Sequence, residues 1–492
     1  MNILILSSEA VPFAKTGGLA DVSTSLCVEL NRLGHDARLL IPEYCPAIDR
    51  SLYTLDRVMS GLKVVLGGHE HICNIEKCRI PGTSQKSHSF VYFVQYGGFF
   101  ERPGMYSESG IDYWDNPQRF AYLCKTALEW CLAEEWIPDV IHCNDWQTAL
   151  LPVYLKTHVS YRDNPLLDNV KVLMSIHNLS YQGRFDSWYN PEIEVGPEVF
   201  HLHGLEFYGD LNLLKGGIMY ADRVSTVSPT YAMEIQTSEF GCGLDGVLQA
   251  RSEDLSGILN GIDESVWKPS VDKAIAKKYS LHGMNGKKAC KKALQEELGL
   301  KVDENIPMIG LISRLTYQKG FDLFLSQLDA LLSRDVQVVV LGTGDNNLVH
   351  WLDDVARRYP SNVAVALRFD EGLSHRILAG SDLFLMPSRF EPCGLTQMYA
   401  MKYGTVPVVR ATGGLKDSVI DATPTSLEDG TATGFCFERF DGWDMIQALD
   451  RALDMYRNDA AQWKKLMKNG MSADFSWSSS AKSYVELYQS MM

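Results

Sequence analysis

Near the start of the chain, the segment Lys15-Thr16-Gly17-Gly18 combines residue types that suit the binding of an anion. Lys15 supplies a positive charge, and adjacent glycines let the backbone turn tightly and approach a ligand. The amide groups at the start of a following helix also favour negative charge. A plain strand-to-helix connection is the alternative. The segment fits neither G-x-G-x-x-G nor G-x-x-x-x-G-K-[ST], so the sequence supports neither a dinucleotide fold nor a P-loop ATPase.

A second pair of cations, Arg314 and Lys319, stands five residues apart before an expected helix at residues 321–332. The guanidinium offers a forked set of donors and the ammonium a mobile point charge, so the two could clamp a diphosphate. Two solvated basic side chains near a helix start are the alternative. Because the helix dipole disfavours cations there, and because the protein is acidic, the pattern favours anion binding.

Glu391 lies in the segment from Ser388 to Thr396, after an expected strand and before an expected helix at residues 397–401. A carboxylate in this position could accept hydrogen bonds from sugar hydroxyls or stabilise positive charge on an anomeric carbon. A helix N-cap carboxylate is the alternative. Cys393 is interpreted as a packed small residue, since no histidine stands next to it in the sequence to activate a thiol.

Two further polar segments follow expected strands in the first half. Asp145 and Trp146 together suit a sugar, because a carboxylate binds hydroxyls and an indole covers an apolar ring face. His177 repeats the arrangement after the next strand, and a structural histidine is the alternative there.

The sequence contains no D-x-D, no H-E-x-x-H and no cysteine cluster. The metal-binding patterns of many nucleotide-sugar transferases are therefore missing. We expect no metal and no cofactor, and a transfer in which protein cations stabilise a diphosphate.

Composition limits the class of protein. The 492 residues are 46% hydrophobic and 22% charged, which indicates a globular chain of two or three domains. The net charge of -15 makes nucleic acid a poor partner. No apolar run approaches the roughly 20 residues of a membrane-spanning helix, so no membrane partner is expected. Met1 leads directly into an expected strand, and the eleven cysteines are scattered, which predicts a cytoplasmic protein with reduced thiols.

Apolar runs alternate with helical patterns as far as about Leu259, and the alternation restarts at Pro307, which predicts a duplicated α/β organisation with parallel strands. The helix from Asp21 to Leu33 is predicted from the recurrence of Val22, Leu26, Leu30 and Leu33. The polar stretch from Lys273 to Gln295 is expected to be helical and solvent-facing. The expected strands are residues 2–7, 37–41, 90–94, 140–143, 171–176 and 223–227, then 308–313, 336–342, 363–368, 383–387 and 406–410.

Taken together, these segments resemble the family of bacterial glycogen synthases and plant-type starch synthases over essentially the whole chain. The resemblance is carried by Lys15 to Val22, His142 to Trp146, Ser175 to Leu179, Ser313 to Leu315, Gln318 to Gly320, Ser388 to Gln397 and Thr412 to Leu415. It implies the GT-B fold, an α/β fold in which two Rossmann-like α/β/α domains with parallel sheets face a central cleft. The expected domains are residues 1–259, joined by a C-terminal helix at 475–492, and residues 260–474.

The resemblance also implies a reaction and a set of site residues. The reaction is the transfer of glucose from ADP-glucose to the non-reducing end of an α-1,4-glucan, with retention at the anomeric carbon. The implied catalytic residues are Glu391, His177, Lys319, Arg314 and Asp145. The implied donor-binding residues are Lys15, Gly17, Gly18, Asp21, Asn260, Arg314, Lys319, Phe369, Cys393, Gly394, Leu395 and Thr396, and the implied acceptor-binding residues are Phe100, Asp145 and Trp146.

Phe369 and Phe100 stand where some members of the family carry tyrosine, so a hydroxyl is lost at each position. The alternatives are a retaining GT-B glucosyltransferase that uses UDP-glucose and a non-catalytic glucan-binding homologue. The expected partners are ADP-glucose and glycogen or starch, for a monomer or small homo-oligomer. A processed plastid protein is the alternative to a cytoplasmic one.

Overall fold

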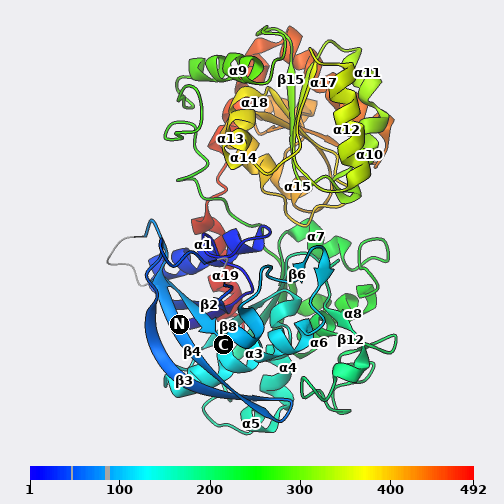
Figure 1. Cartoon of the computed structure of the whole chain (residues 1–492). Helices are drawn as coiled ribbons and strands as arrows, with labels where there is room; N and C mark the ends of the chain where they lie inside the picture. Colours follow the sequence, from blue (N-terminus) through cyan, green and yellow to red (C-terminus); the bar gives the residue numbers. More distant parts are fainter. Residues whose placement is uncertain (46–47, 84–88) are drawn as a thin grey trace. The chain divides into compact units, whose positions relative to one another are not determined.

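The computed structural model describes residues 1–45, 48–83 and 89–492, and the chain divides into two compact units (Figure 1). The first unit comprises Met1–Val227, Ala232–Ile258 and Trp477–Met492. The second comprises Ser228–Tyr231 and Leu259–Ser476. The chain therefore leaves the first unit twice, briefly at Ser228–Tyr231 and then from Leu259, and returns to it for its last helix.

The first unit is built on a nine-stranded sheet with the order β14-β13-β9-β8-β1-β2-β5-β4-β3. Neighbouring strands from β14 to β5 are parallel, and their buried apolar runs suit a sheet that is covered on both faces. The strands are β1 (Asn2–Leu6), β2 (Asp36–Pro42), β3 (Asp56–Leu66), β4 (His69–Arg79), β5 (Phe90–Gln95), β8 (Val140–Asn144), β9 (Lys171–Ile176), β13 (Arg223–Thr226) and β14 (Leu255–Gly257).

All six strands predicted in the first half are present, within one residue of their predicted ends. β14 at one edge of the sheet was not predicted, nor were β3 and β4 at the other, where β3 pairs antiparallel with β4 and β4 pairs antiparallel with β5. In the second half of β3, buried and exposed residues alternate, because one face of the edge is open to solvent. An alternating strand has no continuous apolar run by which it could be recognised.

Helices and short elements complete the first unit. In α1 the predicted apolar face ends at Leu30, because Leu33 lies beyond the helix and is 39% exposed. The helices are α1 (Leu19–Arg32), α2 (Gly97–Phe100), α3 (Asn116–Ala133), α4 (Leu150–Thr157), α5 (Val159–Arg162), α6 (Leu213–Tyr220), α7 (Pro229–Glu234), which begins in the second unit, α8 (Asp245–Ala250) and α19 (Trp477–Gln489). The short elements are β6 (Ser107–Glu108), β7 (Ile111–Asp112), β10 (Arg184–Phe185), β11 (Glu206–Phe207), β12 (Asp210–Asn212), η1 (Trp146–Thr148), η2 (Ser187–Tyr189) and η3 (Ser252–Asp254).

The last helix, α19, is fixed to the first unit by a buried polar chain. The Tyr488 hydroxyl lies 2.8 Å from Nδ1 of His142, and Nε2 of His142 lies 2.6 Å from Oγ of Ser175. Burial lowers the pKa of His142 to about 3, so the ring is neutral and can donate through one nitrogen while it accepts through the other. The C-terminal residues therefore complete the core beside β8.

The second unit is built on a six-stranded parallel sheet with the order β17-β16-β15-β18-β19-β20. In order of sequence this is 3-2-1-4-5-6, the Rossmann arrangement. Figure 1 shows α9, α13 and α14 on one side of the sheet and α10, α11 and α12 on the other. The strands are β15 (Met308–Ile312), β16 (Gln337–Leu341), β17 (Val363–Ala366), β18 (Leu383–Met386), β19 (Val406–Arg410) and β20 (Phe435–Phe437).

All five strands predicted in the second half are present, but two helical predictions need correction. The predicted helix at 321–332 is two helices, α10 and α11, separated by Gln327. The helices are α9 (Asn285–Glu297), η4 (Tyr317–Lys319), α10 (Phe321–Ser326), α11 (Leu328–Leu332), α12 (Asn346–Arg358), α13 (Glu371–Gly380), α14 (Thr396–Lys402), α15 (Gly413–Ser418), α16 (Pro424–Glu428), α17 (Gly442–Asn458) and α18 (Ala460–Ser472). Among the described residues, no helix of either unit has the length and apolarity needed to cross a membrane.

The prediction of a solvent-facing helix from Lys273 to Gln295 was only partly right. The helix, α9, begins only at Asn285, and one face of it is buried. The Lys287 ammonium donates to the carbonyl oxygens of Leu378 and Ala379 at the end of α13, at 3.4 and 3.2 Å. A lysine that places its ammonium among carbonyl oxygens can lie on a buried face, which charge patterning alone does not reveal.

We expect Tyr488→Phe to destabilise the first unit by roughly 1 to 3 kcal/mol, because it leaves a nitrogen of the buried His142 without its partner. Urea denaturation of the full chain measures this loss. Tyr181→Phe, at a residue that is largely exposed, is the control and should change little. Equal stability of parent and Tyr488→Phe would contradict the role given to the hydroxyl.

Candidate functional site

In each unit the predicted site residues follow strands at the point where the sheet order reverses. In the first unit β1 lies between β2 and β8, and the loops after β1 and β8 carry Lys15 and Asp145. In the second unit β15 lies between β16 and β18, and the loops after β15 and β18 carry Lys319 and Glu391. Chains that leave neighbouring parallel strands in opposite directions open a crevice at their carboxyl ends, where ligands bind.

The Lys15–Gly18 loop differs from the open anion site expected from its sequence. The Glu9 carboxylate accepts hydrogen bonds from the amide groups of Thr16 and Gly17, at 2.8 and 3.1 Å. The Lys15 ammonium lies 2.8 Å from a carboxylate oxygen of Asp21 and is half exposed. Two of the loop's amides are therefore occupied by a carboxylate of the protein, and the charge of Lys15 is already paired.

Asp145 is held in a backbone conformation that L-residues rarely adopt. Its φ and ψ are 57° and -177°, a region essentially restricted to glycine. Its carboxylate accepts a hydrogen bond from the His177 amide at 2.7 Å. Burial raises the pKa of Asp145 to about 7, although hydrogen bonds from the amides of His177 and Asn178 act in the opposite direction. The carboxyl group can therefore carry a proton near neutral pH.

His177 is a neutral imidazole whose tautomer is fixed by its neighbour. The Asn144 amide nitrogen donates to the Leu6 carbonyl, so the Asn144 side-chain oxygen is the acceptor for Nε2 of His177, at 2.8 Å. Burial lowers the pKa of His177 to about 4. Nδ1 is thus an acceptor suited to a hydroxyl group rather than a cation suited to a phosphate.

The two aromatic residues predicted to bind an acceptor differ in accessibility. Trp146 is half-buried and meets Phe185 edge-on, with ring centroids 5.5 Å apart. Phe100 is fully buried and meets Tyr44 edge-on at 5.9 Å. A phenyl ring has no polar group that needs water, so it packs inside the core. In this structure the Phe100 ring is therefore not accessible to an acceptor.

Lys319 and Glu391 form an ion pair in the second unit. The Lys319 ammonium lies 2.6 Å from Oε2 of Glu391, and the Ser388 hydroxyl donates to the same oxygen at 3.1 Å. Glu391 is only 5% exposed. Because a buried carboxylate without a partner is costly, Lys319 and Ser388 are what allow a charged Glu391 at this position.

Two glycines bring the loops of this ion pair into contact. Gly320 has a φ of 73°, and a Cβ there would lie 1.9 Å from the Pro387 carbonyl oxygen. Gly413 has a φ of 44°, and a Cβ there would lie 2.0 Å from the Glu391 carbonyl oxygen. Any other residue would force the loops apart. The predicted glycine turn at 412–415 therefore serves close packing around Glu391.

The remaining predicted donor residues surround these loops. Arg314 is exposed, and its guanidinium makes no ion pair or hydrogen bond within the described residues. Cys393 is buried, and burial raises the pKa of its thiol to about 12, which agrees with its interpretation as a packed residue. Asn260 is buried and hydrogen-bonds to Cys393. Gly394, Leu395 and Thr396 are half-buried where α14 begins, and Gly17, Gly18 and Asp21 lie at the start of α1.

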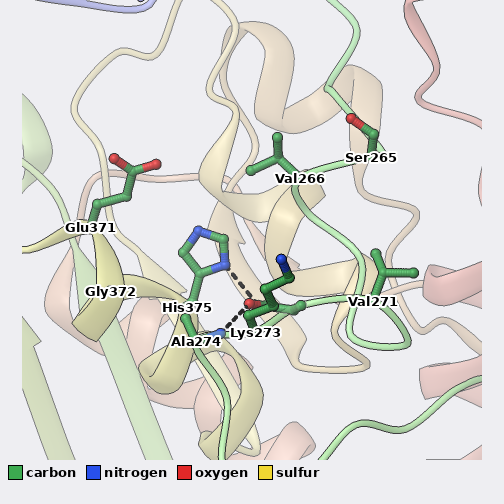
Figure 2. A pocket seen from close by; sticks show the side chains of 9 residues that line it. Ser265, Val266, Val271, Lys273, Ala274, Glu371, Gly372 and His375 are labelled. Carbon is green, nitrogen blue, oxygen red and sulfur yellow. Dashed lines mark hydrogen bonds and ion pairs between the residues drawn. The ribbon is translucent and has the colours of Figure 1, made fainter. Parts of the chain in front are cut away.

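Phe369 projects from the second unit with 84% of its surface exposed. Glu371, Gly372 and His375, which follow Phe369 closely in the sequence, line part of a cavity of about 510 Å³ (Figure 2). Nδ1 of His375 lies 2.7 Å from a carboxylate oxygen of Asp272. The ring also stacks on Trp267 at 4.0 Å. These contacts fix the segment after Leu259 against α13.

Glu9 and Ser388 belong to the site but were missed in the sequence. Ser388 opens the segment from Ser388 to Gln397 but was given no role, Glu9 lies outside every quoted motif, and both follow an apolar strand within a few residues. A polar residue directly after a parallel strand is the signal that could have identified them.

Two α/β units, with polar residues at the switch point of each sheet, define the class of GT-B glycosyltransferases. Residues 2–250 match the family described as "Starch synthase catalytic domain", and residues 293–469 match "Glycosyl transferases group 1". The chain belongs to the glycogen and starch synthase family.

Individual relatives agree with this assignment. "Glycogen synthase 2" of Geobacter metallireducens is 44% identical over 492 residues, which covers 99% of this chain and 98% of the relative. The catalytic domain of starch synthase IV from Arabidopsis thaliana, solved with ADP and acarbose, has a TM-score of 0.89 and 34% identity, and covers 100% of this chain and 99% of that one. Sucrose-phosphate synthase from Thermosynechococcus elongatus shares the fold, with a TM-score of 0.61, 17% identity and coverage of 100% and 98%.

The backbone of Asp145 leads to a stability prediction. Asp145→Gly and Asp145→Ala both remove the carboxylate, but only glycine suits a φ of 57°. We expect Asp145→Gly to be more stable than Asp145→Ala by about 1 kcal/mol, as measured by urea denaturation. An alanine variant as stable as the glycine variant would show that this backbone is not strained.

Proposed function

We propose that this protein is a glucosyltransferase that moves glucose from ADP-glucose to the non-reducing end of an α-1,4-glucan, with retention at the anomeric carbon. The observation that carries the proposal is the Lys319–Glu391 ion pair on the loops after β15 and β18. Relatives named glycogen synthase, and a similar starch synthase solved with ADP and acarbose, support the choice of substrates.

Donor binding is assigned first to the cations of the second unit. Lys319 and Arg314 hold the diphosphate of ADP-glucose, and the exposed ring of Phe369 packs on the base. Arg314 has no competing carboxylate among the described residues, so its full charge is available. These cations stabilise the charge that develops on the departing ADP, which is the task a metal ion performs in other transferases.

The sugar is assigned to groups that exchange hydrogen bonds with hydroxyls. Glu391 contacts the glucosyl unit, and neutral His177 accepts from a hydroxyl through Nδ1. Asp145 and Trp146 face the sugar and the acceptor. The pKa of Asp145, close to neutrality, suits a group that both donates and accepts a hydrogen bond.

Retention follows from attack on the same face from which ADP leaves. The bond between C1 of glucose and the β-phosphate oxygen breaks, and the acceptor hydroxyl oxygen bonds to C1. The leaving phosphate takes the hydroxyl proton. Lys319 and Ser388 donate hydrogen bonds to Oε2 of Glu391, and this favours a carboxylate that stabilises the reacting sugar over one that attacks C1.

A cytoplasmic location completes the proposal and is supported by eleven free thiols.

We expect Lys319→Ala to lower the turnover number about a hundredfold or more, because the leaving diphosphate loses a cation. Release of ADP from ADP-glucose in the presence of glycogen measures the turnover. A turnover number within a few-fold of the parent would refute the assignment of Lys319.

Two further variants separate this effect from a loss of stability. Lys402 pairs with Glu264 at 2.6 Å in the same unit, and its side chain is about as shielded as that of Lys319, so Lys402→Ala removes a shielded lysine from an ion pair outside the proposed site. It should leave the turnover number unchanged. The double variant Lys319→Ala with Glu391→Gln removes both charges, and should recover stability without recovering activity.

The donor and the acceptor are tested together in the parent. We expect nucleotide release to be faster with ADP-glucose than with UDP-glucose, and to depend on glycogen, with Glu391→Gln as the inactive control. Release that is indifferent to glycogen would exclude a synthase. Faster release from UDP-glucose would reassign the donor.

A further inference from the structure

Glu9 is the most completely hydrogen-bonded carboxylate of the first unit's candidate site, and it has no part in the proposed reaction. Oε2 accepts from the amides of Thr16 and Gly17. Oε1 accepts from the Thr16 hydroxyl at 2.5 Å and from the Tyr106 hydroxyl at 2.9 Å. Glu9 is only 4% exposed. Its charge is thus balanced by four dipolar donors and by no cation among the described residues.

These contacts change what the glycine-rich loop can offer to a ligand. The amides of Thr16 and Gly17 face inward onto Glu9, so they are not available to a phosphate. Gly18 is the N-cap of α1, and as a glycine it has no side chain with which to cap the first turn of the helix. Lys15 immediately precedes the amides held by Glu9, and its ammonium reaches outward to Asp21.

We propose that Glu9 is a positioning residue, whose buried carboxylate holds the Lys15–Gly18 loop in the conformation that presents Lys15 and the start of α1 to the donor. This inference rests on the proposed function, because the ligand that the loop would bind is the donor, ADP-glucose. Glu9 itself touches no substrate. The carboxylate of Glu9 accepts the hydrogen bonds of the Thr16 and Gly17 amides inside the protein. Lys15 and the start of α1 are then the groups that face the diphosphate.

A glutamine at position 9 would keep the shape of the side chain and remove its charge, so the hydrogen-bond network predicts what each contributes. The side-chain oxygen of a glutamine could accept from the amides of Thr16 and Gly17. Its NH₂ group could donate to the hydroxyls of Thr16 and Tyr106, since a hydroxyl can rotate from donor to acceptor. The Tyr106 hydroxyl already has a second partner in Ser8, at 2.8 Å. Glu9→Gln should therefore preserve the loop, whereas Glu9→Ala should release it.

The test compares the full-length parent with Glu9→Ala, Glu9→Gln and a matched control, Glu129→Ala. Glu129 accepts from the buried Tyr161 hydroxyl at 2.8 Å, so its removal also deprives a tyrosine of a carboxylate in the same unit. Hydrogen–deuterium exchange of the peptide covering residues 11–19 reports on the loop without any substrate. Initial rates of ADP release give separate KM values for ADP-glucose and for glycogen.

We expect Glu9→Ala to speed exchange in this peptide and to raise the KM for ADP-glucose about tenfold or more, with the KM for glycogen within about threefold of the parent. Glu9→Gln should restore both readouts to near the parent, and Glu129→Ala should change neither. Unchanged exchange in Glu9→Ala, or equal rises of both KM values, would overturn the proposal.

Two outcomes keep this inference separate from the proposed function. If the parent releases no ADP from ADP-glucose, the proposed function fails and the donor-presenting part of this inference fails with it, while the exchange data still decide whether Glu9 holds the loop. If Glu9→Ala does not fold, Glu9→Asp replaces it, because the shorter side chain withdraws the carboxylate from the amides. That variant should show the same donor-selective defect, and parental kinetics in it would count against the proposal.

Discussion

The arrangement of parallel strands is the constraint on which both candidate site surfaces depend. In a parallel sheet every strand ends at the same edge, so polar residues placed directly after strands collect there. In the second unit this brings η4, after β15, against the loop that follows β18, and Gly320 and Gly413 remove the side chains that would keep the loops apart. The Lys319–Glu391 contact therefore results from strand order and from missing Cβ atoms as much as from the two charges themselves.

Burial determines what each polar group of the site can do. The pKa of His177 is lowered and that of Asp145 is raised by the same cause, the loss of water around a charge. Both groups are thereby moved toward neutral forms, which exchange hydrogen bonds with hydroxyls. The Glu391 carboxylate is instead held by the hydrogen bonds that Lys319 and Ser388 donate to it. The first unit thus holds neutral hydrogen-bonding groups, and the second holds a fixed pair of charges.

The sequence alone predicted eleven strands of the two main sheets, most of them marked by a continuous apolar run, because burial on both faces leaves that pattern in the residues themselves. It missed the three-residue strands β14 and β20. It did not predict β3 and β4, where one face is open, or the burial of Lys287, whose ammonium finds its partners about a hundred residues away. The residues brought to the switch points were predictable, since each follows a strand. The backbone of Asp145 and the hydrogen bonds of Glu9 were not, because a dihedral angle and a contact between loops depend on tertiary structure.

The two site lysines are paired with carboxylates in different ways, and this difference decides how each can respond to a diphosphate. The Lys15–Asp21 pair is partly exposed, and such pairs contribute about 0 to 1 kcal/mol, so a phosphate can replace Asp21 at little cost. The Lys319–Glu391 pair is shielded, and separating it would leave Glu391 uncompensated inside the protein. Under the proposed function, Lys319 therefore attracts the diphosphate while it keeps its carboxylate, and Arg314, which has no such partner among the described residues, supplies a charge that is not already paired.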